Sequence, residues 1–171
     1  MKKTRKLTFA AVCTALTILL FFLGMLIKTG TAAIFFLTTL LSMILITETD
    51  RGYGTLSYVA AGLLLYFLLP QKEMVISYIA FVGIYAVIKS LAEQIKNRGL
   101  EWVVKIAFIN LSIGAAYLLF RLLVGTVVLK LPLWILWPAG NLILIGYDLL
   151  LTFGIGYYNR NLAKRIHNGV K

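Results

Sequence analysis

The sequence predicts an all-α integral membrane protein, a bundle of six transmembrane helices with both termini on the cytoplasmic side. The 171 residues are 61% hydrophobic and 13% charged, with a mean hydropathy of +0.92. A soluble domain is about 45–50% apolar and about 25% charged. Six apolar segments come close to the roughly 20 residues that a helix needs to cross the hydrocarbon core. Basic residues are unevenly divided between the two ends of these segments.

The segments that we expect to cross the membrane are 7–27, 31–47, 53–69, 74–88, 102–124 and 133–158, in a single transmembrane domain over 1–171. Runs such as Leu63-Leu64-Leu65 lack the polar–apolar alternation of a membrane-spanning strand. Since lipid cannot bond to backbone groups, the segments are expected to be helices. The longest polar connection, 89–101, leaves room for a turn and a half-helix at the interface.

The first apolar segment follows a basic stretch, as the core of a secretory signal peptide does. The segment 7–27 is too long for an ordinary signal-peptide core, and a second apolar segment follows almost at once. We therefore expect 7–27 to remain in the protein as its first span.

The distribution of charge predicts the orientation of the chain. The formal net charge is +11, from 17 Lys and Arg against 6 Asp and Glu. With six spans and an inner N-terminus, Lys28, Lys72, Arg121 and Lys130 fall at outer ends, and the other 13 basic residues, Lys89 and Lys105 among them, fall on inner segments. Cytoplasmic loops are enriched in Lys and Arg. We accordingly expect a multi-pass protein of the cytoplasmic (inner) membrane that contacts lipid and binds no nucleic acid.

The sequence lacks motifs for catalysis. It has no Gly-rich phosphate loop with a lysine, no His-Glu-x-x-His and no paired cysteines, and His167 stands alone in the basic tail. We therefore expect no enzymatic activity, no cofactor and no metal ion. If the protein takes part in ATP-driven transport, a partner has to supply the ATPase.

Polar and aromatic residues follow one face of each of the last three spans. Such residues are costly at membrane depth, so each needs an explanation. Helical spacing aligns Asn110, Gly114, Tyr117 and Arg121 in the fifth span, Trp134, Trp137, Asn141 and Asp148 in the sixth, and Tyr78 and Tyr85 in the fourth. If these faces converge, they line an outward-facing pocket. Its candidate binding residues are Tyr78, Asn110, Tyr117, Arg121, Trp134, Trp137 and Asn141.

Simpler explanations exist for several of these residues. Trp134 fits an aromatic belt in the headgroup region, and Arg121 can extend its side chain to the outer interface. Asn110 and Asp148 lie nearer the middle of their spans at similar depth. For these two residues we favour a structural hydrogen bond between helices over a proton or cation step.

Small residues recur at four-residue spacing in two spans. The first span has Ala11-x-x-x-Ala15, and the third has Ser57-x-x-x-Ala61. This spacing lets another helix approach closely. The contact can be packing inside the bundle or docking of a partner protein.

The stretch Arg5-Lys6-Leu7-Thr8-x-Ala10-Ala11-x-x-Thr14-Ala15-Leu16, together with the size and the six spans, resembles the S component of energy-coupling factor transporters. The resemblance implies capture of a vitamin or similar nutrient in an outward-facing pocket, in partnership with a transmembrane scaffold and two ATPase subunits. It also implies that Ala11 and Ala15 form a docking motif. In the third span only Ser57 and Ala61 stand where the family has a second alanine pair.

On this interpretation the loops 28–31 and 70–73 close over the nutrient, and the cationic outer face favours an anionic or zwitterionic ligand. The main alternative is a scaffold of the cell-envelope machinery similar to the rod-shape protein MreD, which binds no small molecule. Two further alternatives are a lipid-modifying enzyme that uses Asp148 or Asp50-Arg51, and a holin-like pore.

Overall fold

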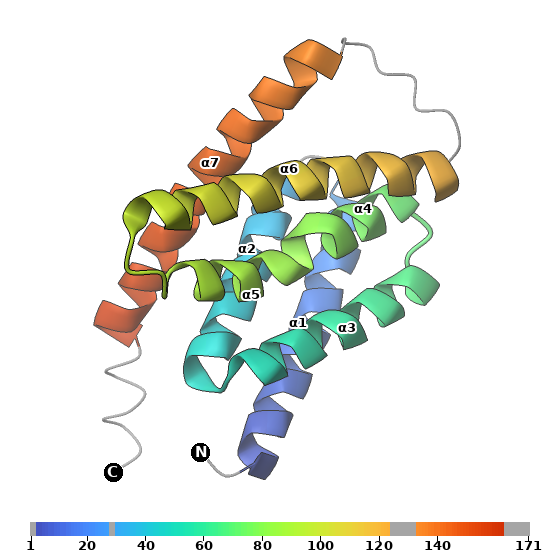
Figure 1. The fold of residues 1–171 in the computed structure, drawn as a ribbon. Coiled ribbons are helices and arrows are strands. Elements are labelled where there is room, and N and C mark those ends of the chain that lie inside the picture. Colours follow the sequence, from blue (N-terminus) through green and yellow to red (C-terminus); the bar gives the residue numbers. More distant parts are fainter. Residues whose placement is uncertain (1–2, 28–29, 124–132, 163–171) are drawn as a thin grey trace.

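The computed structural model describes residues 3–27, 30–123 and 133–162, with the side chains of 133–136 and 162 outside the description. Every regular element in these ranges is a helix (Figure 1). The helices are α1 (Lys3–Leu26), α2 (Thr31–Glu48), α3 (Arg51–Leu68), α4 (Lys72–Ser77), η1 (Tyr78–Val82), α5 (Gly83–Ala92), α6 (Arg98–Leu123), α7 (Leu133–Tyr157) and η2 (Tyr158–Leu162).

These helices follow the predicted apolar segments closely, and α4, η1 and α5 run on from one another as the predicted fourth span. Among the described residues, five helical stretches are long and apolar enough to cross a membrane: α1, α2, 72–92, α6 and 137–161. The remaining helix, α3, has 18 residues and begins with Arg51. The protein is therefore an all-helical, multi-pass membrane type with five to six candidate spans.

One predicted connection is shorter than expected. The segment 89–101 was expected to hold a turn and an interfacial half-helix. Instead, α5 continues to Ala92 and α6 begins at Arg98, which leaves only 93–97 as a turn. Lys89 is buried inside the bundle and pairs with Asp148, which favours the continuation of α5 past it.

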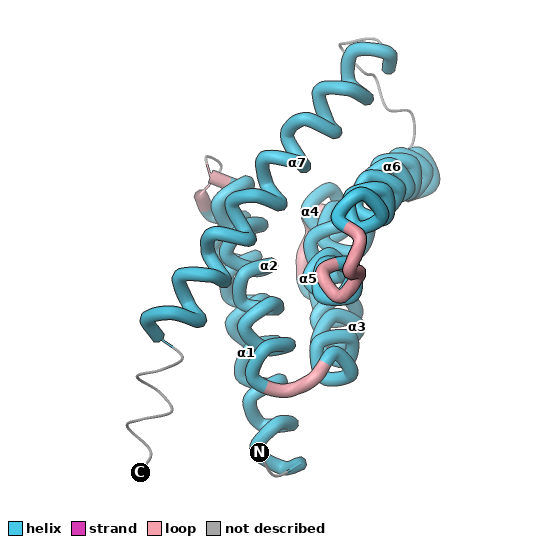
Figure 2. The backbone as a smooth tube through the Cα atoms, turned by 60° about the vertical axis from the view of Figure 1, so that its left-hand side comes forward, coloured by secondary structure: helices cyan, strands magenta, loops and turns pink. Residues whose placement is uncertain are grey.

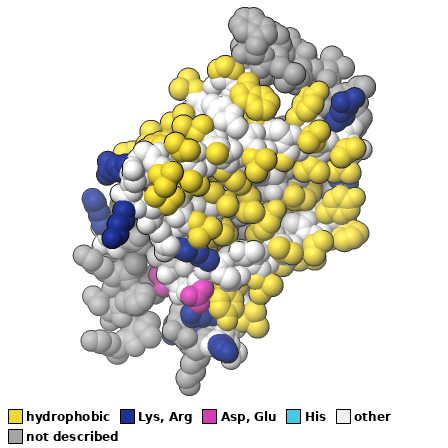
Figure 3. All heavy atoms as spheres, in the orientation of Figure 1, with side chains coloured by type: hydrophobic (Ala, Val, Ile, Leu, Met, Phe, Trp, Pro, Cys, Tyr) yellow, Lys and Arg dark blue, Asp and Glu magenta, His cyan; other side chains and the backbone are white. Residues whose placement is uncertain are grey.

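The helices form two layers that cross each other (Figure 2). One layer contains α1, α2 and α7, and the other contains α3, α6 and the α4–α5 helix. Between the layers, α1 packs against α3, and α2 packs against α5. Hydrophobic side chains cover most of the face seen in Figure 3, over α3, α5 and α6, as expected for a surface in contact with acyl chains.

Three contacts bring four chain segments to one end of the bundle. Lys6 at the start of α1 pairs with Asp50, Arg51 donates a hydrogen bond to the Ser90 carbonyl, and the Tyr158 hydroxyl donates to Glu48. We name this the basic end. The ends of α1 and α6 and the starts of α2 and α4 meet at the opposite end, where they surround one cavity.

The fourth span contains a π-helical turn, and side chains of neighbouring helices donate hydrogen bonds to two of its backbone carbonyls. Tyr58 from α3 donates its hydroxyl to the Ile79 carbonyl at 2.9 Å, and Thr39 from α2 donates to the Val82 carbonyl at 3.1 Å. Gly83 follows this turn. A Cβ atom added there would lie 2.4 Å from the Tyr58 ring and 2.7 Å from the Tyr78 ring. The π-helical turn therefore depends on a residue without a side chain.

We expect Gly83→Ala to destabilise the protein by about 1–3 kcal/mol, because the added methyl group displaces two packed tyrosine rings. Gly114→Ala is the matched control, since a Cβ atom at Gly114 meets no heavy atom within 4 Å. The control is expected to be neutral or stabilising by up to about 1 kcal/mol. Thermal unfolding in detergent tests the pair, and equal midpoints would contradict the packing described here.

Candidate functional site

The most buried charges in the described structure form a cluster between α5, α6 and α7. Lys89, Lys105 and Asp148 are 0%, 3% and 2% exposed. The Lys89 ammonium bonds to Oδ1 of Asp148, and the Lys105 ammonium bonds to Oδ2 at 3.0 Å. Tyr85 donates its hydroxyl to Oδ1 at 2.7 Å. We name these four residues the Asp148 cluster; it connects three helices through one carboxylate.

Two further acids pair with the lysines of the cluster. Lys89 also pairs with Glu93 at 2.9 Å, and Lys105 pairs with Glu101 at 2.8 Å. Lys89 donates as well to the Thr152 hydroxyl at 2.8 Å. Two ammonium groups thus face three carboxylates. Burying an unpaired charge away from water costs a large amount of free energy. The pairing with carboxylates is therefore what allows both lysines to be buried.

Sequence reasoning missed the two lysines, because it counted Lys89 and Lys105 only among the basic residues on the inner side. A signal was present for Lys105, which lies between Val103-Val104 and Ile106-Ala107 inside an apolar run. The partner of Asp148 was also misjudged. Asp148 shares no hydrogen bond with Asn110 and bonds to the lysines and Tyr85 instead.

Asn110, Trp137 and Asn141, three of the predicted binding residues, do come together. The Asn110 and Asn141 side chains exchange hydrogen bonds of 3.2 Å, and the Trp137 indole donates to the side-chain oxygen Oδ1 of Asn110 at 2.5 Å. These contacts join α6 to α7. They match the structural hydrogen bond that the sequence favoured for Asn110, although with Asn141 as the partner.

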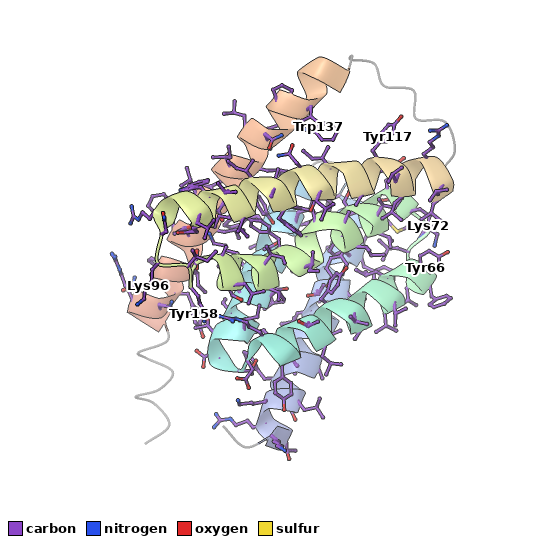
Figure 4. The ribbon with its side chains drawn as sticks, viewed as in Figure 1. Tyr66, Lys72, Lys96, Tyr117, Trp137 and Tyr158 are labelled. Atoms are coloured by element: carbon purple, nitrogen blue, oxygen red, sulfur yellow. The ribbon has the colours of Figure 1, made fainter. Side chains whose placement is uncertain are left out.

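The remaining predicted binding residues are dispersed. Tyr78 is 1% exposed in the core, with its ring packed edge-on against Phe21, so it does not line an open pocket. Tyr117 and Arg121 are exposed on α6, and Figure 4 shows Tyr117 on the side of α6 away from α4. The Trp134 side chain lies outside the described residues. Ligand contacts for Tyr117, Arg121 and Trp134 stay predictions.

The two small-residue patches face different surroundings. Ala11 and Ala15 are exposed on α1. Ser57 and Ala61 are buried, and the Ser57 hydroxyl lies 2.8 Å from that of Thr14 on α1. Ser57 and Ala61 therefore join α3 to α1 and do not form an outer docking surface together with the first patch.

A cavity of about 820 Å³ lies at the end opposite the basic end. Of the predicted binding residues whose side chains are described, none lines it. Its walls do include Thr31 and the loop 70–73, which the sequence predicted to lie over the ligand. The lining residues are Gly24, Met25, Thr31, Phe35, Pro70, Gln71, Lys72, Glu73, Met74, Ser77, Phe120 and Leu123.

Two of the polar groups around the cavity are already bonded to backbone. The Lys72 ammonium donates to the Tyr66 and Leu69 carbonyls at 2.6 and 3.2 Å, and it lies over the Tyr66 ring (Figure 4 labels both residues). It thus caps the carboxyl end of α3. The Ser77 hydroxyl donates to the Glu73 carbonyl at 2.9 Å. Within the described residues, the Glu73 carboxylate has no hydrogen bond or ion pair.

Within the part of the chain that the structure describes, no group of three or more His, Cys, Asp or Glu side chains could hold a metal ion. Comparison with protein families, with curated proteins and with solved structures finds no match for this chain.

We expect Asp148→Ala to destabilise the protein by about 3–5 kcal/mol, because it leaves two buried ammonium groups without their shared carboxylate. Replacing the three buried charges with apolar residues, as in Lys89→Met with Lys105→Met and Asp148→Leu, should recover most of this loss. Unfolding by increasing sodium dodecyl sulfate in mixed micelles provides the measurement.

Asp50→Asn is the control for this series, because Asp50 pairs with Lys6 at the exposed basic end. Such an exposed pair contributes only about 0–1 kcal/mol. If Asp148→Ala and Asp50→Asn had equal effects, the Asp148 cluster would not be holding the helices together.

Proposed function

We propose that this chain is the substrate-capture subunit of an energy-coupling factor importer and binds a vitamin or similar small nutrient. The observation that supports this proposal is the cavity at the end opposite the basic end. Its volume of about 820 Å³ falls within the roughly 300–1,000 Å³ typical of small-molecule sites. With the basic end in the cytoplasm, the cavity opens to the exterior.

The lining of the cavity suits capture of a small organic molecule. Phe35 and Phe120 supply aromatic surface, and Met25 and Met74 supply flexible thioether surface. Thr31 and the loop 70–73 border the opening. These residues replace Tyr78 and the α6–α7 contacts as the ligand-binding set in our proposal.

The energy for release would come from partners. The sequence contains no phosphate-binding loop, so the proposal includes a transmembrane scaffold and two ATPase subunits. Ala11 and Ala15 support scaffold docking, because they leave a shallow exposed face on α1 that a foreign helix can approach closely.

A second candidate is a cell-envelope scaffold similar to MreD. The observation that favours it is the contact between α6 and α7, where Asn110, Trp137 and Asn141 bond to one another and leave no unpaired donor for a ligand between them. On this alternative the cavity at the outer end would hold only lipid or water.

Thermal unfolding of the purified chain against a panel of vitamins distinguishes the two. A captured nutrient at about 100 times its Kd should stabilise the fold by about 2.7 kcal/mol. Ser77→Phe should abolish the shift, because Ser77 lines the cavity and the larger ring takes up space that the ligand needs. Thr55→Phe is the control: Thr55 is exposed on α3 and, like Ser77, bonds only to its own helix. If no vitamin shifts the midpoint, or the shift survives Ser77→Phe, the capture proposal fails.

We expect Ala11→Leu with Ala15→Leu to reduce co-purification of a transmembrane scaffold from the native membrane, because the larger side chains hold a partner helix away. Ligand capture should be unchanged, since neither alanine lines the cavity. The control is Leu63→Ala with Leu64→Ala, on an exposed face of α3. Undiminished recovery of the scaffold with the leucine variant would contradict docking at this face.

A further inference from the structure

The basic residues at the outer ends of the helices do not supply an unbonded positive group to the cavity in the described structure. The sequence favoured an anionic or zwitterionic ligand, because four basic residues face Glu73 alone at these ends. In the structure, Lys72 directs its ammonium to the Tyr66 and Leu69 carbonyls. Arg121 does not line the cavity, and Lys28 and Lys130 lie outside the described residues.

Among the described residues that line the cavity, Glu73 has the charged group that bonds to no other described residue. It lines the cavity and is exposed, and it pairs with no other described side chain. Glu73 lies in the first turn of the helix that continues through α4, η1 and α5. The dipole of this helix favours a negative charge at that position.

The apolar walls are compatible with a cation. Phe35 from α2 and Phe120 from α6 line the same cavity as Glu73, and aromatic faces attract positive charge as well as apolar surface. A divalent metal ion does not fit this site, because such ions require several oxygen ligands and Glu73 is the only carboxylate among the lining residues described.

We infer that the ligand of this cavity is an organic cation, an ammonium or cationic nitrogen heterocycle joined to an apolar body. This inference rests on the proposed function and narrows its substrate class. The cationic group pairs with the Glu73 carboxylate, and the apolar body lies against Phe35, Phe120, Met25 and Met74.

Three aromatic probes of similar size test the charge preference: benzyltrimethylammonium, phenylacetate and benzyl alcohol. The chain is reconstituted in phosphatidylcholine nanodiscs, and thermal unfolding is followed at increasing probe concentration. We expect the cation to raise the midpoint most. Glu73→Gln should weaken binding of the cation by about tenfold or more, since the charged partner is lost. Glu73→Asp should keep part of the binding, and Asp50→Asn at the basic end should keep all of it.

The outcomes separate the ligand class from the capture function. Preference for phenylacetate, equal shifts with all three probes, no shift with the cation, or an unchanged cation effect in Glu73→Gln each overturn the cation assignment. An anionic vitamin that stabilises the chain and is blocked by Ser77→Phe would overturn the assignment but leave the capture proposal standing. A vitamin shift that survives Ser77→Phe would instead remove the cavity from the capture proposal.

Discussion

The carboxylate of Asp148 is the contact on which the arrangement of the two layers depends. It lies on α7 and accepts bonds from Lys89 and Tyr85 on the α4–α5 helix and from Lys105 on α6. Lipid is as apolar as a leucine side chain, so burying apolar surface between helices provides little driving force in a membrane. A buried and fully paired carboxylate, in contrast, has few alternative partners, and it therefore specifies which helices meet.

Polar contacts also position the rest of α7. Most of its large apolar side chains point outward, Leu142, Ile143, Leu150 and Phe153 among them. Leu151 packs inward in an apolar core cluster, and the other inward contacts include polar ones: Asn141 with Asn110, and Tyr147 with Thr39 at 2.6 Å. In η2, Tyr158 adds a bond to Glu48 at 2.9 Å. Polar residues that suggested a ligand pocket in the sequence are thus used to position a helix. The cavity forms elsewhere, where four helix ends and the loop 70–73 meet.

The polar groups between the helices and those around the cavity differ in whether they are already bonded. The groups that hold the bundle together are bonded to one another, whereas the outer-end cavity combines apolar walls with the Glu73 carboxylate. On the capture proposal, substitutions at Gln71, before α4, and at Glu73, in its first turn, can change the ligand without disturbing the Asp148 cluster. On the capture proposal, structural and recognition roles lie at different depths of the same bundle.

The sequence by itself determined the helical class and the helix positions, because the length of an apolar run and the need for internal backbone bonding are local properties. The predicted ranges 7–27 and 31–47 became α1 (Lys3–Leu26) and α2 (Thr31–Glu48). The partners of the polar residues were decided only by the tertiary structure. Lys105 and Asp148 are 43 residues apart, and Tyr78 turned into the core rather than toward a pocket. Helical spacing fixes which residues share a face, but the crossing of the two layers decides what that face meets.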